Sequence, residues 1–193
     1  MDLSPSGRDF RKMFTLSRMH PNLPTVMLFL RVTARISAMF LAGAFAASAL
    51  RQLWASQITL WMAANRHRFT MLFALSHTFH LAGVAALISV VPERFSTMAA
   101  LPTFIFGGLG YALIYYAAVA AFSRRKNPEI RDSKMQTAIL YILWTVFTLA
   151  FVLGMRSHVW IYAPLVTMML LAWIARLYAR RVSATVATAG API

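Results

Sequence analysis

Apolar residues dominate this chain in long runs, and short polar or basic segments separate the runs. A helix needs about 20 mainly apolar residues to cross the hydrocarbon core of a bilayer. Five stretches meet that requirement, at residues 33–54, 68–91, 101–123, 135–155 and 158–177. The pattern therefore predicts an all-α fold, a polytopic transmembrane helical bundle of about five spans. No polar segment between the runs is long enough to form a separate soluble core.

The remaining segments flank this bundle, which we assign to residues 33–178 as one domain. Residues 1–32 form a basic N-terminal tail with a short interfacial helix, broken at "HPNLP". Residues 179–193 are rich in small side chains and predict a disordered C-terminal tail. The segment "QLWASQITLWMAANR" predicts a second interfacial helix, with Trp54 and Trp61 as anchors at the headgroup level.

The composition supports a membrane protein. The 193 residues are 60% apolar and 12% charged, with a mean hydropathy of +0.63, whereas soluble domains average roughly 45–50% apolar and about 25% charged. The net charge of +14 comes from residues in the tails and in the gaps between spans, where they set topology and contact anionic lipid. We therefore expect the lipid bilayer as partner, with anionic lipid at the basic loops, and no nucleic acid.

The basic residues also predict an orientation. If the 51–68 loop, the 124–134 loop and the C-terminus share one side, that side holds the majority of the 19 Lys and Arg residues. Basic loops near spans favour the cytoplasm. We therefore expect the C-terminus to be cytoplasmic and the N-terminus to be outside.

Two histidines lie deep in the second stretch. At about 1.5 Å per residue from a start near residue 66, His77 lies roughly 16 Å and His80 roughly 21 Å into the bilayer. Their spacing places them on neighbouring parts of one helix face. Ionisable residues inside a span are costly and are functional candidates. The pair therefore predicts a polar cavity or a cofactor, and the alternative is that both only make interhelical hydrogen bonds.

Haem b is the cofactor that best suits neutral imidazoles in an antiparallel helical bundle, because histidine supplies an axial nitrogen. Zinc sites need three or four ligands, and the chain has no cysteine and no acidic residue within its spans. The absence of cysteine also excludes iron–sulfur clusters and thiolate-ligated haem. A quinone or pigment stays an alternative occupant.

Three segments resemble the ferric reductase-like transmembrane family, which includes the haem subunit of the periplasmic methionine sulfoxide reductase system. The run "RHRFTMLFALSHTFHL" is similar to the start of the family's haem-bearing helix, "GGLGYALIYYAAVAAFS" to its Gly-Gly-x-Gly-Tyr helix, and "RDSKMQTAILYILW" to the start of its next haem-bearing helix. The resemblance implies a haem b electron-transfer subunit of the bacterial inner membrane. It further implies that His80 ligates the haem iron.

The opposing histidine of the family pattern is Gln136 in this chain, so the fourth span carries no histidine. A bis-histidine haem between the second and fourth spans therefore cannot form. His158 opens the fifth span on the side toward which His80 lies, which makes it one candidate second ligand. His77, a methionine or no sixth ligand are the alternatives.

Two hypotheses follow from these residues. In the first, the chain is a haem b electron-transfer subunit that binds haem through His80, His77 and His158 and works with a separate redox partner. In the second, it is a haem-free accessory subunit of a larger respiratory or photosynthetic membrane complex. No catalytic residue is assigned, and whether the chain acts as an enzyme stays open.

Overall fold

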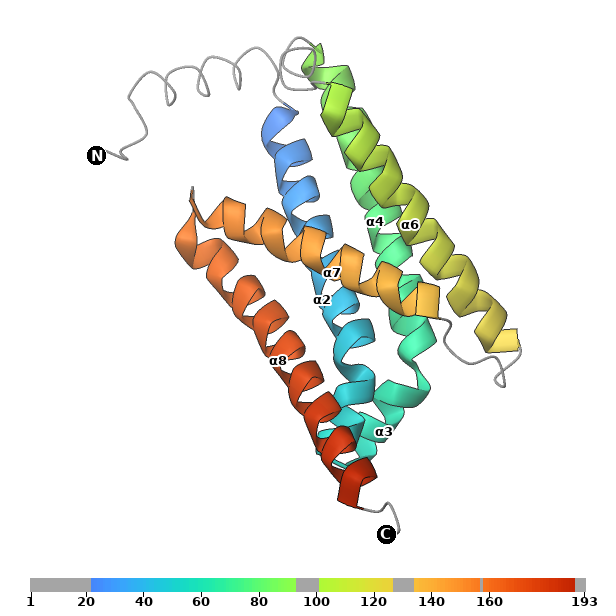
Figure 1. Ribbon diagram of the computed structural model, residues 1–193. Helices are drawn as coiled ribbons and strands as arrows, with labels where there is room; N and C mark the ends of the chain where they lie inside the picture. The colour runs from blue at the N-terminus through green and yellow to red at the C-terminus, as the bar shows by residue number, and fades with distance from the viewer. Residues whose placement is uncertain (1–21, 93–100, 127–133, 157, 190–193) are drawn as a thin grey trace.

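Helices account for nearly all of the structure, a computed structural model that describes residues 22–92, 101–126, 134–156 and 158–189 (Figure 1). The helices in chain order are α2 (Leu23–Leu53), α3 (Gln57–Ala64), α4 (Arg66–Val90), α6 (Leu101–Lys126), α7 (Lys134–Met155) and α8 (Val159–Ala189). The described segments contain no strand. The predicted all-α helical bundle is therefore confirmed.

Four of these helices are long and apolar enough to cross a membrane. They are α2, α4, α7 and the Val159–Ser183 part of α8. They support a multi-pass membrane protein, as the hydropathy pattern predicts. Helix α6 occupies the position expected for the third of five spans, and the count of five stays a prediction.

Two predicted boundaries differ from the structure. The first long helix begins at Leu23 rather than at 33, with Pro24 in its first turn, where proline is tolerated because those N–H groups have no intrahelical partner. The rest of the predicted N-terminal tail, residues 1–21, lies outside the described residues. At the other end, α8 continues to Ala189, so much of the segment expected to be a disordered tail from 179 is helical.

The predicted interfacial helix is present as α3, although it is shorter than the segment that suggested it. Ser56 caps its N-terminus in a capping box, because the Ser56 side chain accepts from the backbone N–H of Thr59 while the Thr59 side chain accepts from that of Ser56. Trp54 and Trp61 are both more than half exposed. A tryptophan that anchors a helix at the membrane surface has to be exposed in this way.

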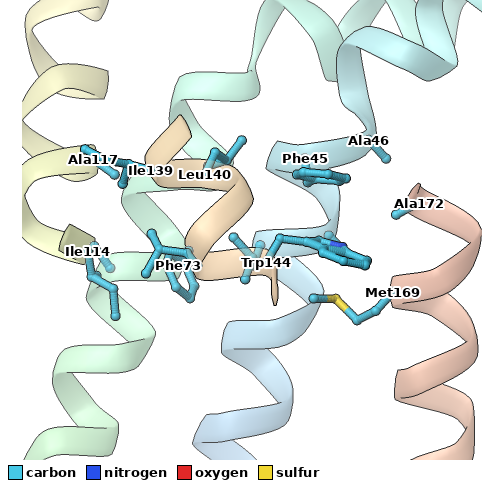
Figure 2. Close-up of a cluster of buried hydrophobic side chains, with 14 residues drawn as sticks. Phe45, Ala46, Phe73, Ile114, Ala117, Ile139, Leu140, Trp144, Met169 and Ala172 are labelled. Atoms are coloured by element: carbon cyan, nitrogen blue, oxygen red, sulfur yellow. The ribbon is translucent and has the colours of Figure 1, made fainter. Parts of the chain in front are cut away.

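Helix α2 is the centre of the bundle, in contact with α3, α4, α7 and α8. Helix α6 lies along α4 on one side, α8 lies on the opposite side, and α7 crosses α2 obliquely in this view (Figure 1). The main buried cluster draws side chains from all five long helices. Within it, Figure 2 shows Trp144 of α7 between Phe45 of α2 and Met169 of α8.

Candidate functional site

His77 and His80 lie together on α4, as their spacing predicts. Their rings stack with centroids 5.1 Å apart and planes inclined by 15°. Both side chains are partly buried. The structure thus brings two of the three predicted site histidines into direct contact inside an apolar helix.

His80 is fixed by the N-terminal part of α2. Its Nδ1 lies 3.2 Å from the carbonyl oxygen of Leu30 and 3.1 Å from Oγ1 of Thr33. The Thr33 hydroxyl donates to the Phe29 carbonyl oxygen at 2.8 Å, so its oxygen can accept a further hydrogen bond. One assignment satisfies these contacts, with the ring proton on Nδ1 donated to both oxygens, and it leaves the lone pair on Nε2.

The hydrogen bond to Leu30 orients His80 as metal-binding histidines are oriented. Histidines that bind metals through one ring nitrogen almost always donate the other N–H to a carboxylate, a backbone carbonyl or water, which fixes the tautomer and the ring orientation. A backbone carbonyl in α2 takes that role here. With Nδ1 as the donor, the lone pair on Nε2 has the chemistry of a metal ligand or of a hydrogen-bond acceptor.

His77 has a different environment, made mainly of aromatic rings. Besides His80, its ring contacts Phe73 on the same helix, Tyr111 of α6 at 5.0 Å and Phe147 of α7 at 5.1 Å between centroids. Its Nδ1 is buried and has no hydrogen-bond partner in the described part of the chain. A buried polar atom left without a protein partner is uncommon, and a water molecule or a ligand can satisfy it.

Glycines of α6 lie within one helical turn of Tyr111, whose ring contacts His77. Gly107 and Gly108 precede Tyr111 by one helical turn, so they share the face that contacts His77. An ideal Cβ on either glycine, or on Gly110, would have no heavy atom within 4 Å. Helices α4 and α6 run antiparallel (Figure 1). The direction along α4 from His77 to His80 is therefore the direction along α6 from Tyr111 to these glycines.

His158 does not join this pair. It lies at the start of α8, is exposed, and uses its backbone to hydrogen-bond with Gly154, Ile161 and Tyr162. Within the described ranges, its side chain has no hydrogen bond or ring contact with His77 or His80. The residue of α7 that faces His77 is Phe147.

Gln136 lies beside the first turns of α4, away from the histidine pair in the middle of that helix. Its Oε1 accepts a hydrogen bond from Nη2 of Arg124 at 2.9 Å, and with Arg66 and Thr70 it lines a small cavity of about 30 Å³. Thr70 precedes His80 by about 15 Å along a helix with a rise of about 1.5 Å per residue. A histidine at position 136 would therefore not oppose His80 across one haem in this bundle.

A separate apolar cavity of about 780 Å³ lies between α2, α3 and α8. Its walls include Met39 and Leu50 of α2, Met62 of α3, and Met168 of α8. No histidine lines it. It can accept the acyl or isoprenoid tail of a lipophilic molecule, and it is not part of the histidine site.

Comparisons with protein-family models, with characterised proteins and with solved structures produced no match. The resemblance to the ferric reductase-like family therefore depends on the quoted motifs alone. The residues that complete the site, Thr33, Tyr111 and Phe147, were not predicted. Tyr111 is distant from the histidines in the sequence and contacts His77 only in the folded chain. No local pattern marks Thr33 or Phe147 as neighbours of a histidine.

Proposed function

We propose that the chain is a membrane haem b electron-transfer subunit in which Nε2 of His80 ligates the iron. The observation that carries the proposal is the hydrogen bond from Nδ1 of His80 to the Leu30 carbonyl oxygen, at 3.2 Å. It selects the tautomer that a metal ligand needs and holds the ring at a fixed angle to α4. An added Cβ at Gly107 or Gly108 would meet no heavy atom within 4 Å, so these exposed positions place no side chain in the way of a macrocycle beside α6.

The proposed site differs from the family pattern in having one histidine ligand rather than two. Haem b, when bound, supplies reversible one-electron transfer at its iron. Thr33 and the Leu30 carbonyl orient His80, whereas the rings of Tyr111 and Phe147 exclude water from the side of His77. In this proposal a separate redox partner delivers and removes the electrons.

An absorption spectrum of the purified chain tests this proposal. We expect a Soret band, with sharpened α and β bands after dithionite reduction, in the unchanged protein and in His158→Ala. We expect His80→Ala to abolish these bands, while His67→Ala, at the exposed end of the same helix, retains them. A colourless protein that keeps its helical content by circular dichroism would refute haem binding. Loss of the bands in His158→Ala would show instead that His158 is a second ligand.

A haem-free accessory subunit of a larger respiratory or photosynthetic complex is the second candidate. It is favoured by the dense ring contacts of His77 with Phe73, Tyr111 and Phe147. In that case the two histidines hold α4 against α2 or contact a quinone or pigment. Copurification of the colourless chain with other membrane subunits would favour this candidate.

We further propose a bacterial inner-membrane location with the C-terminus in the cytoplasm. The C-terminal end of α6 supports this orientation because it carries Arg124, Arg125 and Lys126 in its last turn. The chain has no cysteine, so single cysteines report topology cleanly. We expect Lys126→Cys to react with an impermeant maleimide only from the cytoplasmic side, and Arg156→Cys only from outside. The reverse result would invert the orientation.

A further inference from the structure

Arginines surround two adjoining cavities where α2 ends and α4 begins. The first, of about 460 Å³, lies between Ser48, Arg51 and Gln52 of α2, the end of α3, the first residues of α4, and Arg124 of α6. The second, of about 380 Å³, is lined by Ala64, His67, Arg68, Arg124 and Arg125. Because the cavities share Ala64, His67 and Arg124, they form one cationic cleft. We propose that this cleft binds the phosphate group of an anionic phospholipid.

Two of the arginines are held in place by hydrogen bonds to defined acceptors. Nε of Arg66 donates to the Ala44 carbonyl oxygen at 2.9 Å, and Nη2 of Arg124 donates to Oε1 of Gln136 at 2.9 Å. Both side chains are partly buried. Basic residues that only set topology need to lie at the membrane boundary, and they do not need fixed orientations. Held guanidinium groups that line a cavity are instead preorganised for an anion.

The electrostatics of the cleft favour an anion independently of these hydrogen bonds. Burial is the main cause that lowers the pKa of the Arg124 guanidinium, and the positive charge of nearby Arg66 lowers this pKa further, so an anion between the two groups would reduce their mutual repulsion. The N-terminus of α4 faces the same cleft, and its first turn has no acidic residue and no side-chain cap. Its partial positive charge adds to that of the arginines.

Phosphate is the anion that this set of side chains fits best. The planar guanidinium group matches phosphate oxygens with two parallel N–H donors, and Ser48 and Gln52 add neutral hydrogen-bonding groups beside Arg51. The neighbouring helix α3 exposes Ile58 and Trp61, which suit the boundary between headgroups and acyl chains. The cleft therefore lies at the depth of lipid phosphates. A soluble phosphate ester is the other source of the same group.

Lipid binding to the purified chain in neutral detergent tests the proposal, with native mass spectrometry as the readout. We expect phosphatidylglycerol to bind more tightly than phosphatidylcholine. Each charge-assisted hydrogen bond contributes enough for about a tenfold change in affinity, so Arg51→Gln and Arg124→Gln should each weaken phosphatidylglycerol binding about tenfold. Arg51→Lys keeps the charge and should lose less. Arg181→Gln is the matched control, because Arg181 is exposed near the end of α8 and lines neither cavity.

The outcomes separate the two phosphate sources. If millimolar inorganic phosphate does not displace phosphatidylglycerol, the ligand is the lipid headgroup; displacement by phosphate supports the same cleft with a soluble phosphate ester as ligand. Equal binding of the two lipids, or equal loss in Arg181→Gln, overturns the proposal. Should Arg124→Gln not fold, the exposed pair Arg51→Gln and Arg68→Gln serves in its place. The result does not depend on haem, since a colourless chain can still bind phosphatidylglycerol.

Discussion

Replacing Phe45 with leucine tests how α2, α7 and α8 are held together. Phe45 is fully buried. Its ring stacks on Trp144 with centroids 5.3 Å apart and meets Tyr141 edge-on at 5.0 Å. On α8, Cζ of Arg176 lies 4.5 Å from the centroid of the same ring. The substitution removes all three ring interactions while it keeps an apolar side chain in the core.

The size of the effect can be worked out from these contacts. Each aromatic pair contributes about 0.5–1.5 kcal/mol, and a cation–π contact contributes about 0.5–2 kcal/mol. Because such terms are not additive, we expect Phe45→Leu to lower the free energy of unfolding by about 2–4 kcal/mol. Phe45→Ala also leaves a cavity and should cost about 3–5 kcal/mol.

The assay is equilibrium unfolding in mixed micelles, followed by circular dichroism, with Phe79→Leu as the control. Phe79 lies on α4 and is 54% exposed, so its substitution should change stability by less than about 0.5 kcal/mol. A double-mutant cycle with Arg176→Gln isolates the cation–π contact, because the hydrogen bond from Arg176 to the Phe45 backbone carbonyl is retained in Phe45→Leu. Equal effects of the two phenylalanine substitutions, or no coupling with Arg176, would refute this account of the core.

Two further predictions concern hydrogen bonds between α2 and α4. A double-mutant cycle of Thr33→Val and His80→Leu should give a coupling of about 0.6 kcal/mol, with a ceiling near 1.7 kcal/mol, as for other hydrogen bonds between membrane helices; no coupling would contradict the contact between Thr33 and His80. The buried hydroxyls of Ser37 and Ser76 lie 2.9 Å apart, so Ser37→Ala and Ser76→Ala should each destabilise by about 0.6 kcal/mol, and the double variant should cost less than the sum.

Hydropathy predicted the helices well where their ends are polar, and poorly where a helix continues beyond its apolar part. The start of α4 agrees closely with the predicted start of the second span, because basic residues begin the apolar run. The first span is predicted to start at 33, yet a helix needs only its backbone hydrogen bonds to continue through Arg31. Pro24 was a usable start signal. The alanines after residue 179 favour helix through their intrinsic propensity, which an argument from membrane thickness ignores.

The candidate site was predictable only in its local part. The contact of His77 with His80 follows from helix periodicity. The partners of these histidines come from α2, α6 and α7, and their positions depend on how the helices pack, which no local pattern records. The family pattern directed attention to Gln136, whereas the structure sets Phe147 opposite His77.

The early start of α2 and the orientation of His80 are linked. The Leu30 carbonyl oxygen and the Thr33 hydroxyl contact Nδ1 of His80, and both residues lie in the N-terminal part of α2. A helix that began at 33 would leave the Leu30 carbonyl outside any regular structure. Within a helix, a carbonyl oxygen accepts from the backbone and still has a second lone pair for a side-chain donor. The extension of α2 therefore supplies a backbone acceptor for the partly buried imidazole, beside the hydroxyl of Thr33. The helix boundary that hydropathy missed therefore determines which nitrogen of His80 faces α2.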